Sequence, residues 1–273
     1  MDSKLWKKIV REKQKEVRAL KKRFTLEAIR TASFSVGTEF VSAQMSLLDA
    51  EYLPVILPLQ GRILELDTEL SNYRPFRAAR SFREWPVAAF LVAGDATFLG
   101  GDPAHVNLVK NATGASVILH DFVVDEVQIY QAKAIGADGL LLDANWQERE
   151  QLKRFTEVTY EVGLEPFIRI HSPHLPNGIE PGWIGGVILS PELTVQEIVS
   201  GKLQPLYHLV DENVPILYQT IPETGESLLA LQQTGVQGFL IPENWVLEND
   251  PFEKLIRQFE LLWPERRKGN PED

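Results

Sequence analysis

The sequence contains no cysteine, no long apolar run and no excess of positive charge. The absence of cysteine from its 273 residues excludes disulfides, thiolate nucleophiles and cysteine-ligated metals. No apolar run approaches the ~20 residues that cross a bilayer, and the charged opening MDSKLWKKIVREKQKEV offers no apolar core of a secretory signal. The net charge of -10 disfavours nucleic acid as the main partner. We therefore expect a soluble, cytoplasmic protein with no membrane partner.

Residues 115–144 contain a β-α-β pattern. The apolar runs SVIL and GLLLDA at its two ends are typical of strands that are buried on both faces, as in parallel sheets. Between these runs, Val127, Tyr130 and Ala134 lie at helical spacing, and Gly136 is placed to end the helix. The rest of the chain repeats this unit.

Eight strand candidates alternate with helical stretches such as 147–162 and 226–234. The candidates cover residues 54–60, 86–93, 115–119, 138–144, 165–171, 184–190, 214–220 and 238–243. This pattern favours an α/β fold with a single (β/α)8 TIM barrel over an open doubly wound sheet. No GxGxxG motif follows the first strand, which also disfavours a dinucleotide-binding fold.

Helices are also expected outside the barrel. They cover residues 3–23, 26–31 and 251–262, and residues 34–51 look irregular or weakly helical. The basic face of the first helix is either solvated or meets an anionic partner. The expected organisation is an N-terminal helical extension over 1–50, a barrel over 51–263 and a disordered tail over 264–273.

Candidate functional residues are those at the C-terminal ends of the strands, where barrel enzymes place their chemistry. They are Gln60, Arg62, Phe98, His120, Asp143, Asn145, Arg169, His171, Ser190, Gln219, Thr220 and Glu243. Arg169 inside FIRIH needs a partner, which is either a carboxylate such as Asp143 or Glu243 or an anionic ligand. The histidines show no metal-ligand spacing, so we expect neither a metal nor a cofactor.

Several motifs together resemble the indole-3-glycerol phosphate synthase family along nearly the whole chain. LWKKIVREKQKEVRALKKR resembles the N-terminal helix of that family, and FLVAGDATFLGGDPAHV resembles its second strand and loop. VILHDFVVDEVQIYQAKAIGADGLLLDA is similar to the family's VLRKDFIIDxYQIYEARAxGADAxLLI. The resemblance implies a TIM barrel that closes a ring on an aromatic substrate with loss of carboxylate.

The resemblance also implies that the family's catalytic groups are replaced here. Pro58 and Gln60 stand where the family has its E-x-K pair on strand one, and His120 replaces the strand-three lysine. Arg169 replaces the glutamate of VEVH, whereas His171 is kept. Gln219-Thr220-Ile221 stands for ESG, Pro242 replaces the glycine of VGES, and Ser190 and Pro191 fall near the asparagine and arginine of NNRDL. Glu243 is kept.

These replacements remove the backbone N–H groups that bind the substrate phosphate in the family. They also remove the lysine and glutamate pairs that transfer protons. Synthesis of indole-3-glycerol phosphate itself is therefore the less favoured expectation. Two other functions are possible expectations: an inactive barrel that serves as a scaffold, and an enzyme repurposed for a related ring closure. Because several polar groups are replaced by other polar groups, we favour repurposing. The cyclase of cyanobacterial scytonemin biosynthesis resembles this family. Its substrate is an indolic β-keto acid without a phosphate, on which it closes a ring with loss of carbon dioxide.

This hypothesis assigns roles to the candidate residues. His120 would donate a proton, and the less favoured alternative is a core histidine bonded to Asp121. Arg169 would hold the substrate carboxylate or stabilise the enolate. Glu243 would act as a base or as the ion-pair partner of Arg169. The remaining candidates would bind substrate, with Phe98 either stacking on the indole or packing in the core. The only partner we expect is this small aromatic β-keto acid, and the sequence is compatible with a homodimer.

Overall fold

The computed structural model describes residues 3–35, 37, 39–51, 53–64, 68–70, 73–83, 85, 87–210, 212–220 and 224–247. The helix expected over 251–262, the tail expected over 264–273, the barrel end at 263 and Ile221 lie outside these residues. The division into domains therefore remains a prediction.

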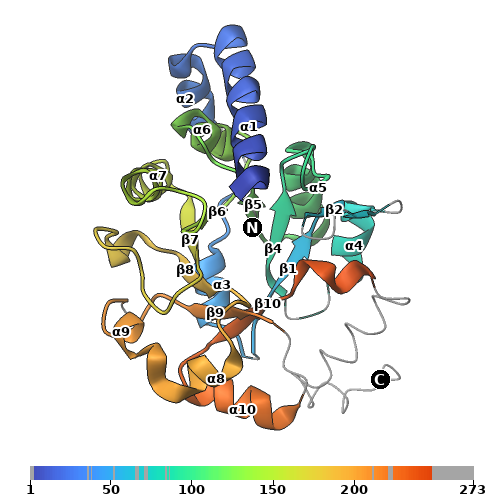
Figure 1. Ribbon diagram of the computed structural model, residues 1–273. Helices are drawn as coiled ribbons and strands as arrows, with labels where there is room; N and C mark the ends of the chain where they lie inside the picture. Colours follow the sequence, from blue (N-terminus) through green and yellow to red (C-terminus); the bar gives the residue numbers. More distant parts are fainter. Residues whose placement is uncertain are drawn as a thin grey trace, which may run out of the picture.

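Eight parallel strands form a closed barrel, which Figure 1 shows in a view into its open end. They are β1 (Val55–Leu59), β4 (Val87–Ala93), β5 (Ser116–His120), β6 (Gly139–Asp143), β7 (Glu165–Ile170), β8 (Gly186–Leu189), β9 (Ile216–Gln219) and β10 (Gly238–Leu240). Each coincides with one of the expected strands apart from small differences at the ends. The (β/α)8 barrel predicted from the sequence is confirmed.

Helices follow the strands and cover the outside of the barrel. They are α4 (Pro75–Ser81), α5 (Ala104–Thr113), α6 (Glu126–Ala134), α7 (Arg149–Glu161), α8 (Val195–Glu197), α9 (Gln204–Tyr207) and α10 (Gly225–Gln233). The expected stop of α6 is confirmed, because Gly136 adopts a φ of 84° that other residues rarely reach. A short hairpin of β2 (Arg62–Ile63) and β3 (Thr68–Glu69), which the sequence did not indicate, follows β1.

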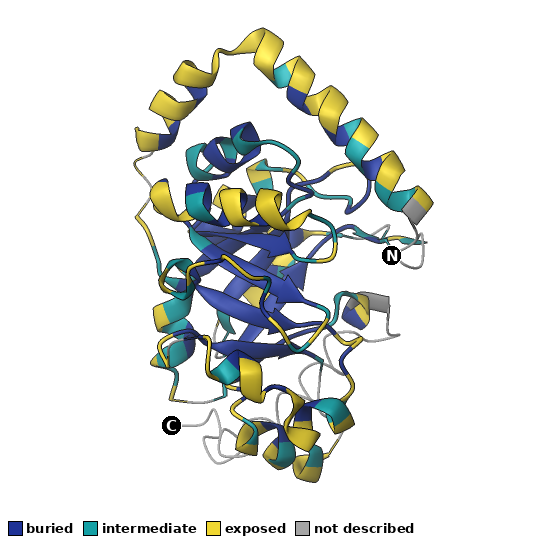
Figure 2. Cartoon of the chain, turned by 60° about the vertical axis from the view of Figure 1, so that its left-hand side comes forward, coloured by how far each residue is buried: buried dark blue, intermediate teal, exposed yellow. Residues whose placement is uncertain are grey.

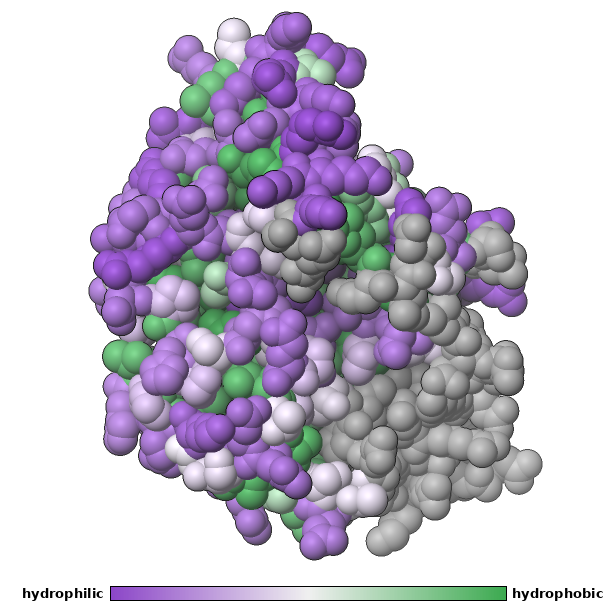
Figure 3. Space-filling model, in the orientation of Figure 1, coloured by the Kyte–Doolittle hydropathy of each residue, from purple (hydrophilic) through white to green (hydrophobic). Residues whose placement is uncertain are grey.

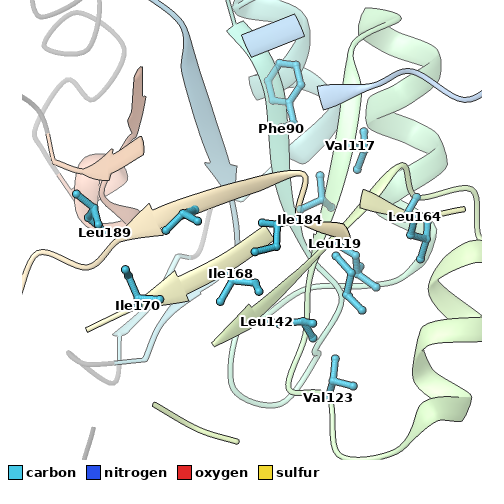
Figure 4. Packing of buried hydrophobic residues seen from close by; sticks show 14 of the residues in the cluster. Phe90, Val117, Leu119, Val123, Leu142, Leu164, Ile168, Ile170, Ile184 and Leu189 are labelled. Atoms are coloured by element: carbon cyan, nitrogen blue, oxygen red, sulfur yellow. The ribbon is translucent and has the colours of Figure 1, made fainter. Parts of the chain in front are cut away.

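The barrel has an apolar layer on each side of its sheet. Outward-facing side chains pack under the helices, and Figure 4 shows Leu119, Leu142 and Ile168 among them. Inward-facing side chains form a second cluster that includes Ile56, Leu91, Ile118, Leu141, Phe167, Ile188, Leu217 and Leu240. Because successive residues of a strand point to opposite sides, the residue two positions beyond an inward-facing one also faces inward.

Helix α3 (Ala43–Leu48) closes the base of the barrel. Ala43 and Leu47 belong to the interior cluster, and the Glu165 carboxylate accepts hydrogen bonds from the backbone N–H groups of Ala43 at 2.8 Å and Gln44 at 3.1 Å. The carboxylate thus satisfies free donors at the helix start. The sequence suggested at most weak helicity here, and the barrel base stabilises the helix.

The N-terminal extension forms a helical hairpin of α1 (Ser3–Arg23) and α2 (Leu26–Phe34), which projects from the barrel in Figure 2. Ile9 and Val17 on the inner side of α1 are buried. Lys21 joins α1 to the start of α6 through a 2.6 Å ion pair with Asp125. The outer side of α1 is hydrophilic (Figure 3). Among the described helices, none has the length and apolarity to cross a membrane.

Candidate active site

The C-terminal rim of the barrel brings together polar side chains from neighbouring strands. His120, Asp143, Arg169 and Gln219 each stand two residues beyond a member of the interior cluster, so all four face inward. All four are buried. The candidates chosen because they end strands therefore do meet at one end of the barrel, directly above its apolar interior.

One side of the rim is ionic, and we refer to Asp143, Arg169, Gln219 and Glu243 as the ionic arc. The Arg169 Nε atom donates to Asp143 Oδ2 at 2.6 Å. Its Nη1 atom lies 3.3 Å from Glu243 Oε1 and 3.4 Å from Gln219 Oε1. Gln219 Nε2 in turn donates to Glu243 Oε2 at 2.6 Å. The sequence left open whether Arg169 pairs with a carboxylate or with an anionic ligand. In the structure it pairs with both candidate carboxylates, Asp143 and Glu243.

The contacts of Arg169 differ in strength. Although burial would raise the pKa of Asp143, the adjacent Arg169 and the hydrogen bond from His171 hold it below its ordinary value. Asp143 is therefore ionised and fixes the guanidinium at the short Nε contact. The two Nη1 contacts are long for charge-assisted hydrogen bonds. This side of Arg169 is the part that an incoming anion could engage.

His171 extends the ionic arc toward solvent. Its Nε2 atom lies 3.0 Å from Asp143 Oδ1 and its Nδ1 atom 3.1 Å from Glu192 Oε2. Although burial would lower the pKa of His171, the hydrogen bond and the charge of Asp143 raise it above its ordinary value. A partly exposed imidazole between two carboxylates can carry a proton at neutral pH. The sequence had assigned His171 only to substrate binding.

On the opposite side of the rim, the inward-facing side chains level with the strand ends are uncharged, and we refer to Gln60, Ala93 and His120 as the neutral arc. The register of β1, β4 and β5 pairs Leu59 with Val92 and Ala93 with His120. One residue further along, Gln60 is level with both. Only the methyl group of Ala93 thus stands between two polar side chains at the same height in the barrel.

His120 does not fit the expected role of a proton donor at neutral pH. Burial, assisted by the positive charge of Arg169, lowers its pKa to about 3, so the imidazole is neutral. The alternative of a hydrogen bond to Asp121 is also wrong, since neither ring nitrogen of His120 has a hydrogen-bond partner within the described chain. The imidazole instead stacks on Trp146, with ring centres 6.3 Å apart and an angle of 14° between the planes.

An aromatic cluster of Trp6, Phe98, Phe122 and Trp146 covers the neutral arc. Trp146 stacks on Trp6 at 5.7 Å and contacts Phe122 at 4.8 Å. Its ring also lies 5.2 Å from the guanidinium carbon of Arg169, so it spans both arcs. Phe98 is buried edge-on against Phe122, which is the packing position. Trp6 places the first turns of α1 beside the barrel mouth.

Lys13 anchors α1 to the rim, and the sequence interpretation missed it. Lys13 is 3% exposed, and its ammonium lies 2.7 Å from carboxylate oxygens of both Asp95 and Asp121. Although burial would lower the pKa of Lys13, the two carboxylates raise it, so the group stays charged. A signal existed in the sequence, because Lys13 interrupts the apolar side of α1 between Ile9 and Val17 at helical spacing.

Ser190 also stands two residues beyond a member of the interior cluster, Ile188, and so faces inward. The other remaining candidates lie at the edges of the rim. Arg62 is not on β1, since the chain turns before it, and its Nη1 atom donates to the Thr97 carbonyl at 3.0 Å. Asn145 is exposed, Thr220 is half-buried and Ser190 is buried next to β8. Among the described residues, no group of three His, Asp or Glu side chains is placed to hold a metal ion.

The sequence profile of indole-3-glycerol phosphate synthase matches residues 6–259. The synthase of Chromobacterium violaceum is 25% identical over 262 residues, or 92% of this chain and 96% of the relative. That of Chloroherpeton thalassium is 25% identical over 245 residues, or 88% and 93%. The match to the synthase of Neisseria meningitidis serogroup B reaches 30% identity over 166 residues, which span 60% of this chain and 64% of the relative.

Solved structures with the same fold include two from Pyrococcus. A mutant tryptophan synthase α-subunit from Pyrococcus furiosus superposes with a TM-score of 0.57 at 14% identity, covering 78% of this chain and 98% of that one. The orotidine 5'-phosphate decarboxylase of Pyrococcus horikoshii gives 0.52 at 15% identity, covering 76% and 98%. At these identities the likeness concerns the fold alone.

Proposed function

The chain belongs to the indole-3-glycerol phosphate synthase family, and we propose that it closes a ring on an indolic β-keto acid with decarboxylation. The substrate carries no phosphate, as in cyanobacterial scytonemin biosynthesis. The observation that carries this proposal is the division of the rim into an ionic arc and a neutral, aromatic-covered arc. An aromatic acid has the same two-sided character, with one charged end and one apolar, weakly polar end.

Arg169 is the group suited to the substrate carboxylate. The short contact to Asp143 orients the guanidinium, and a carboxylate that approaches Nη1 would replace the long contacts to Glu243 and Gln219. A bidentate arginine contact fixes both position and orientation. The same charge would stabilise the enolate that forms as carbon dioxide leaves.

His120 is suited to polarise the ketone without transferring a proton. A neutral imidazole has one N–H group, which can donate a hydrogen bond to the carbonyl oxygen while indole C2 attacks the carbon. Its low pKa makes the imidazole neutral at neutral pH in the ligand-free protein. Ring closure forms the bond from indole C2 to the ketone carbon and releases the proton of C2. His171, with its raised pKa and its contact with Asp143, is the better carrier of this proton to the former ketone oxygen, which leaves as water.

The aromatic cluster supports an indole-bearing substrate. Trp6 and Trp146 are half-buried beside the neutral arc, so an indole that binds there would meet aromatic side chains. Pro242, next to Glu243, has no backbone N–H group to offer a phosphate. The ionic arc also adds two carboxylates around Arg169 that would repel a dianionic phosphate more strongly than a monoanionic carboxylate.

An inactive scaffold is the second candidate, and one observation favours it. Arg169 already has both Asp143 and Glu243 as partners, so the ionic arc is close to electrostatically satisfied without a ligand. A rim that only holds the barrel together would look the same on this side. A purely structural role gives no reason, however, for the buried atoms of Gln60 and His120 that have no partner among the described residues on the other side.

A paired turnover assay tests the proposal. The purified chain is given the indolic β-keto acid and, separately, the carboxyphenylamino deoxyribulose phosphate that the parent family cyclises, with products followed by mass spectrometry. We expect ring closure and carbon dioxide release from the keto acid alone. Turnover of the phosphate alone would identify a true indole-3-glycerol phosphate synthase, and inactivity on both substrates would favour the scaffold.

A further inference from the structure

Gln60 has one hydrogen-bonding atom that the protein leaves unused. Its side chain is 5% exposed, and its Nε2 group donates to the Arg62 carbonyl at 2.9 Å. This bond fixes which end of the amide is which, because the opposite orientation would set two oxygens against each other. The Oε1 atom is buried and has no hydrogen-bond partner among the described residues.

The unused atom is an acceptor, which restricts what can bind there. A buried acceptor without a partner is unfavourable because it has lost its hydrogen bonds to water, and a ligand that supplies a donor removes this penalty. A second carbonyl or a carboxylate would be repelled. Carboxylates also have a cationic partner on the other side of the rim, at Arg169.

The surroundings of Gln60 further restrict the donor. Along the register of the strands, its neighbours at the same height are Ala93 and His120. Adjacent strands lie about 4.8 Å apart, so the backbones that carry Gln60 and His120 are separated by roughly 10 Å, with the small side chain of Ala93 between them. Phe98 and Phe122 share an apolar cluster with Ala93, and Trp146 stacks on His120. Carbon-rich walls favour a neutral donor on an aromatic ring over an ammonium group.

We propose that Gln60 is the specificity residue that accepts the ring N–H of the indole, and that the site thereby selects N–H heteroaromatic acids over isosteres lacking this donor. This inference rests on the proposed function, which supplies the indole. It places the ring on the neutral arc, with the carboxylate on the ionic arc. A site with a buried hydrogen-bonding group discriminates strongly against ligands that leave it unpaired.

The test compares two ligands of equal size. Indole-3-acetate carries the N–H group, whereas benzofuran-3-acetate has an oxygen in its place. Isothermal titration calorimetry of the full chain should give an affinity for the indole about tenfold higher, as expected for one hydrogen bond to a buried acceptor. In Gln60→Met, which keeps the side-chain length but has no acceptor oxygen, the preference should fall to within about twofold.

The matched control is Gln219→Met on the ionic arc. Gln219 is the other buried glutamine of the rim and has both ends of its amide engaged, by Glu243 and Arg169. This variant should weaken both ligands alike and keep the preference. A wild-type protein that binds both ligands equally, or neither, would overturn the inference without any variant, and so would a Gln60→Met protein that keeps the preference.

These outcomes separate the inference from the proposed function. Turnover of the indolic keto acid by a protein that shows no preference for the N–H group would refute the role of Gln60 and leave the cyclase intact. A tenfold preference in a protein without turnover would support the recognition of the ring and point to a binding protein.

Discussion

The two arcs of the rim bury polar groups in opposite ways. In the ionic arc, each polar group named above has a partner within the protein, and Arg169 is fixed by a 2.6 Å contact with Asp143. In the neutral arc, Gln60 Oε1 and both nitrogens of His120 are buried without partners among the described residues. The arcs occupy equivalent positions on neighbouring strands, so the difference comes from the residues and not from the fold. We infer that the ionic arc is organised in advance and that the neutral arc is completed by the ligand.

Breaking the ionic arc should have the largest effect. Arg169→Ala leaves two carboxylates, one of them fully buried, without their cation, which should cost about 3–5 kcal/mol of unfolding free energy. It should also remove most of the cyclisation. Chemical denaturation and the turnover assay measure the two effects. The control is Arg154→Ala, whose exposed pairs with Glu126 and Glu157 should contribute less than about 1 kcal/mol. Equal losses in both variants would contradict the comparison.

Removing the Lys13 anchor of α1, the helix that carries Trp6 of the aromatic cluster, should have the next largest effect. Lys13→Met removes the ammonium that Asp95 and Asp121 share. Both carboxylates keep backbone donors, from Leu99 to Asp95 at 3.1 Å and from Phe122 to Asp121 at 2.6 Å. The expected loss is therefore about 3 kcal/mol, at the lower end for a broken buried pair. Amide exchange in α1 should rise, whereas it should stay unchanged in Lys15→Met on the exposed side. Unchanged exchange in α1 of Lys13→Met would refute this anchoring role.

The neutral arc should make the protein sensitive to acid. The pKa of His120 falls from an ordinary 6.5 to about 3 on folding, so the unfolded chain binds more protons between these values. Its contribution to stability is present above pH 6.5 and is lost as the pH falls, by up to about 1.4 kcal/mol per pH unit. His120→Phe should remove this slope in denaturation experiments between pH 6.5 and 4. If the imidazole polarises the ketone, His120→Ala should slow turnover about 10²-fold.

The ionic arc should show the opposite and smaller pH dependence. The folded pKa of His171 is raised, so its contribution to stability is present below its ordinary pKa of 6.5 and is lost as the pH rises through the folded value. Partial exposure of the ring weakens the effect by solvent screening. His171→Asn should flatten the melting temperature between pH 6 and 9, and an unchanged profile would remove His171 as the titrating group.

The fold could be predicted from the sequence because its signal is repeated and local. Each strand is an apolar run without alternation, and glycines such as Gly136 end the helices between them. The sequence predicted at most weak helicity for α3 and did not indicate the hairpin β2–β3. Helix α3 depends on Glu165, more than a hundred residues away, which no local pattern could indicate.

The candidate site was predictable in membership but not in chemistry. Strand ends identified Arg169, Asp143 and Glu243, and charge alone suggested their pairing. The protonation state of His120 depends on its burial and on Arg169, and both follow from the closed barrel. The role of Lys13 likewise depends on how α1 crosses the rim. Such contacts between distant segments decide pKa values, and a sequence pattern does not contain them.

The most direct test of the division of the rim is a crystal structure of the protein with indole-3-acetate bound. We predict the indole ring over Gln60, Ala93 and His120, with its nitrogen within hydrogen-bond distance of Gln60 Oε1. The carboxylate should lie against Arg169. A ligand in the reverse orientation, with its carboxylate on the neutral arc, or one bound outside the barrel mouth, would contradict the account.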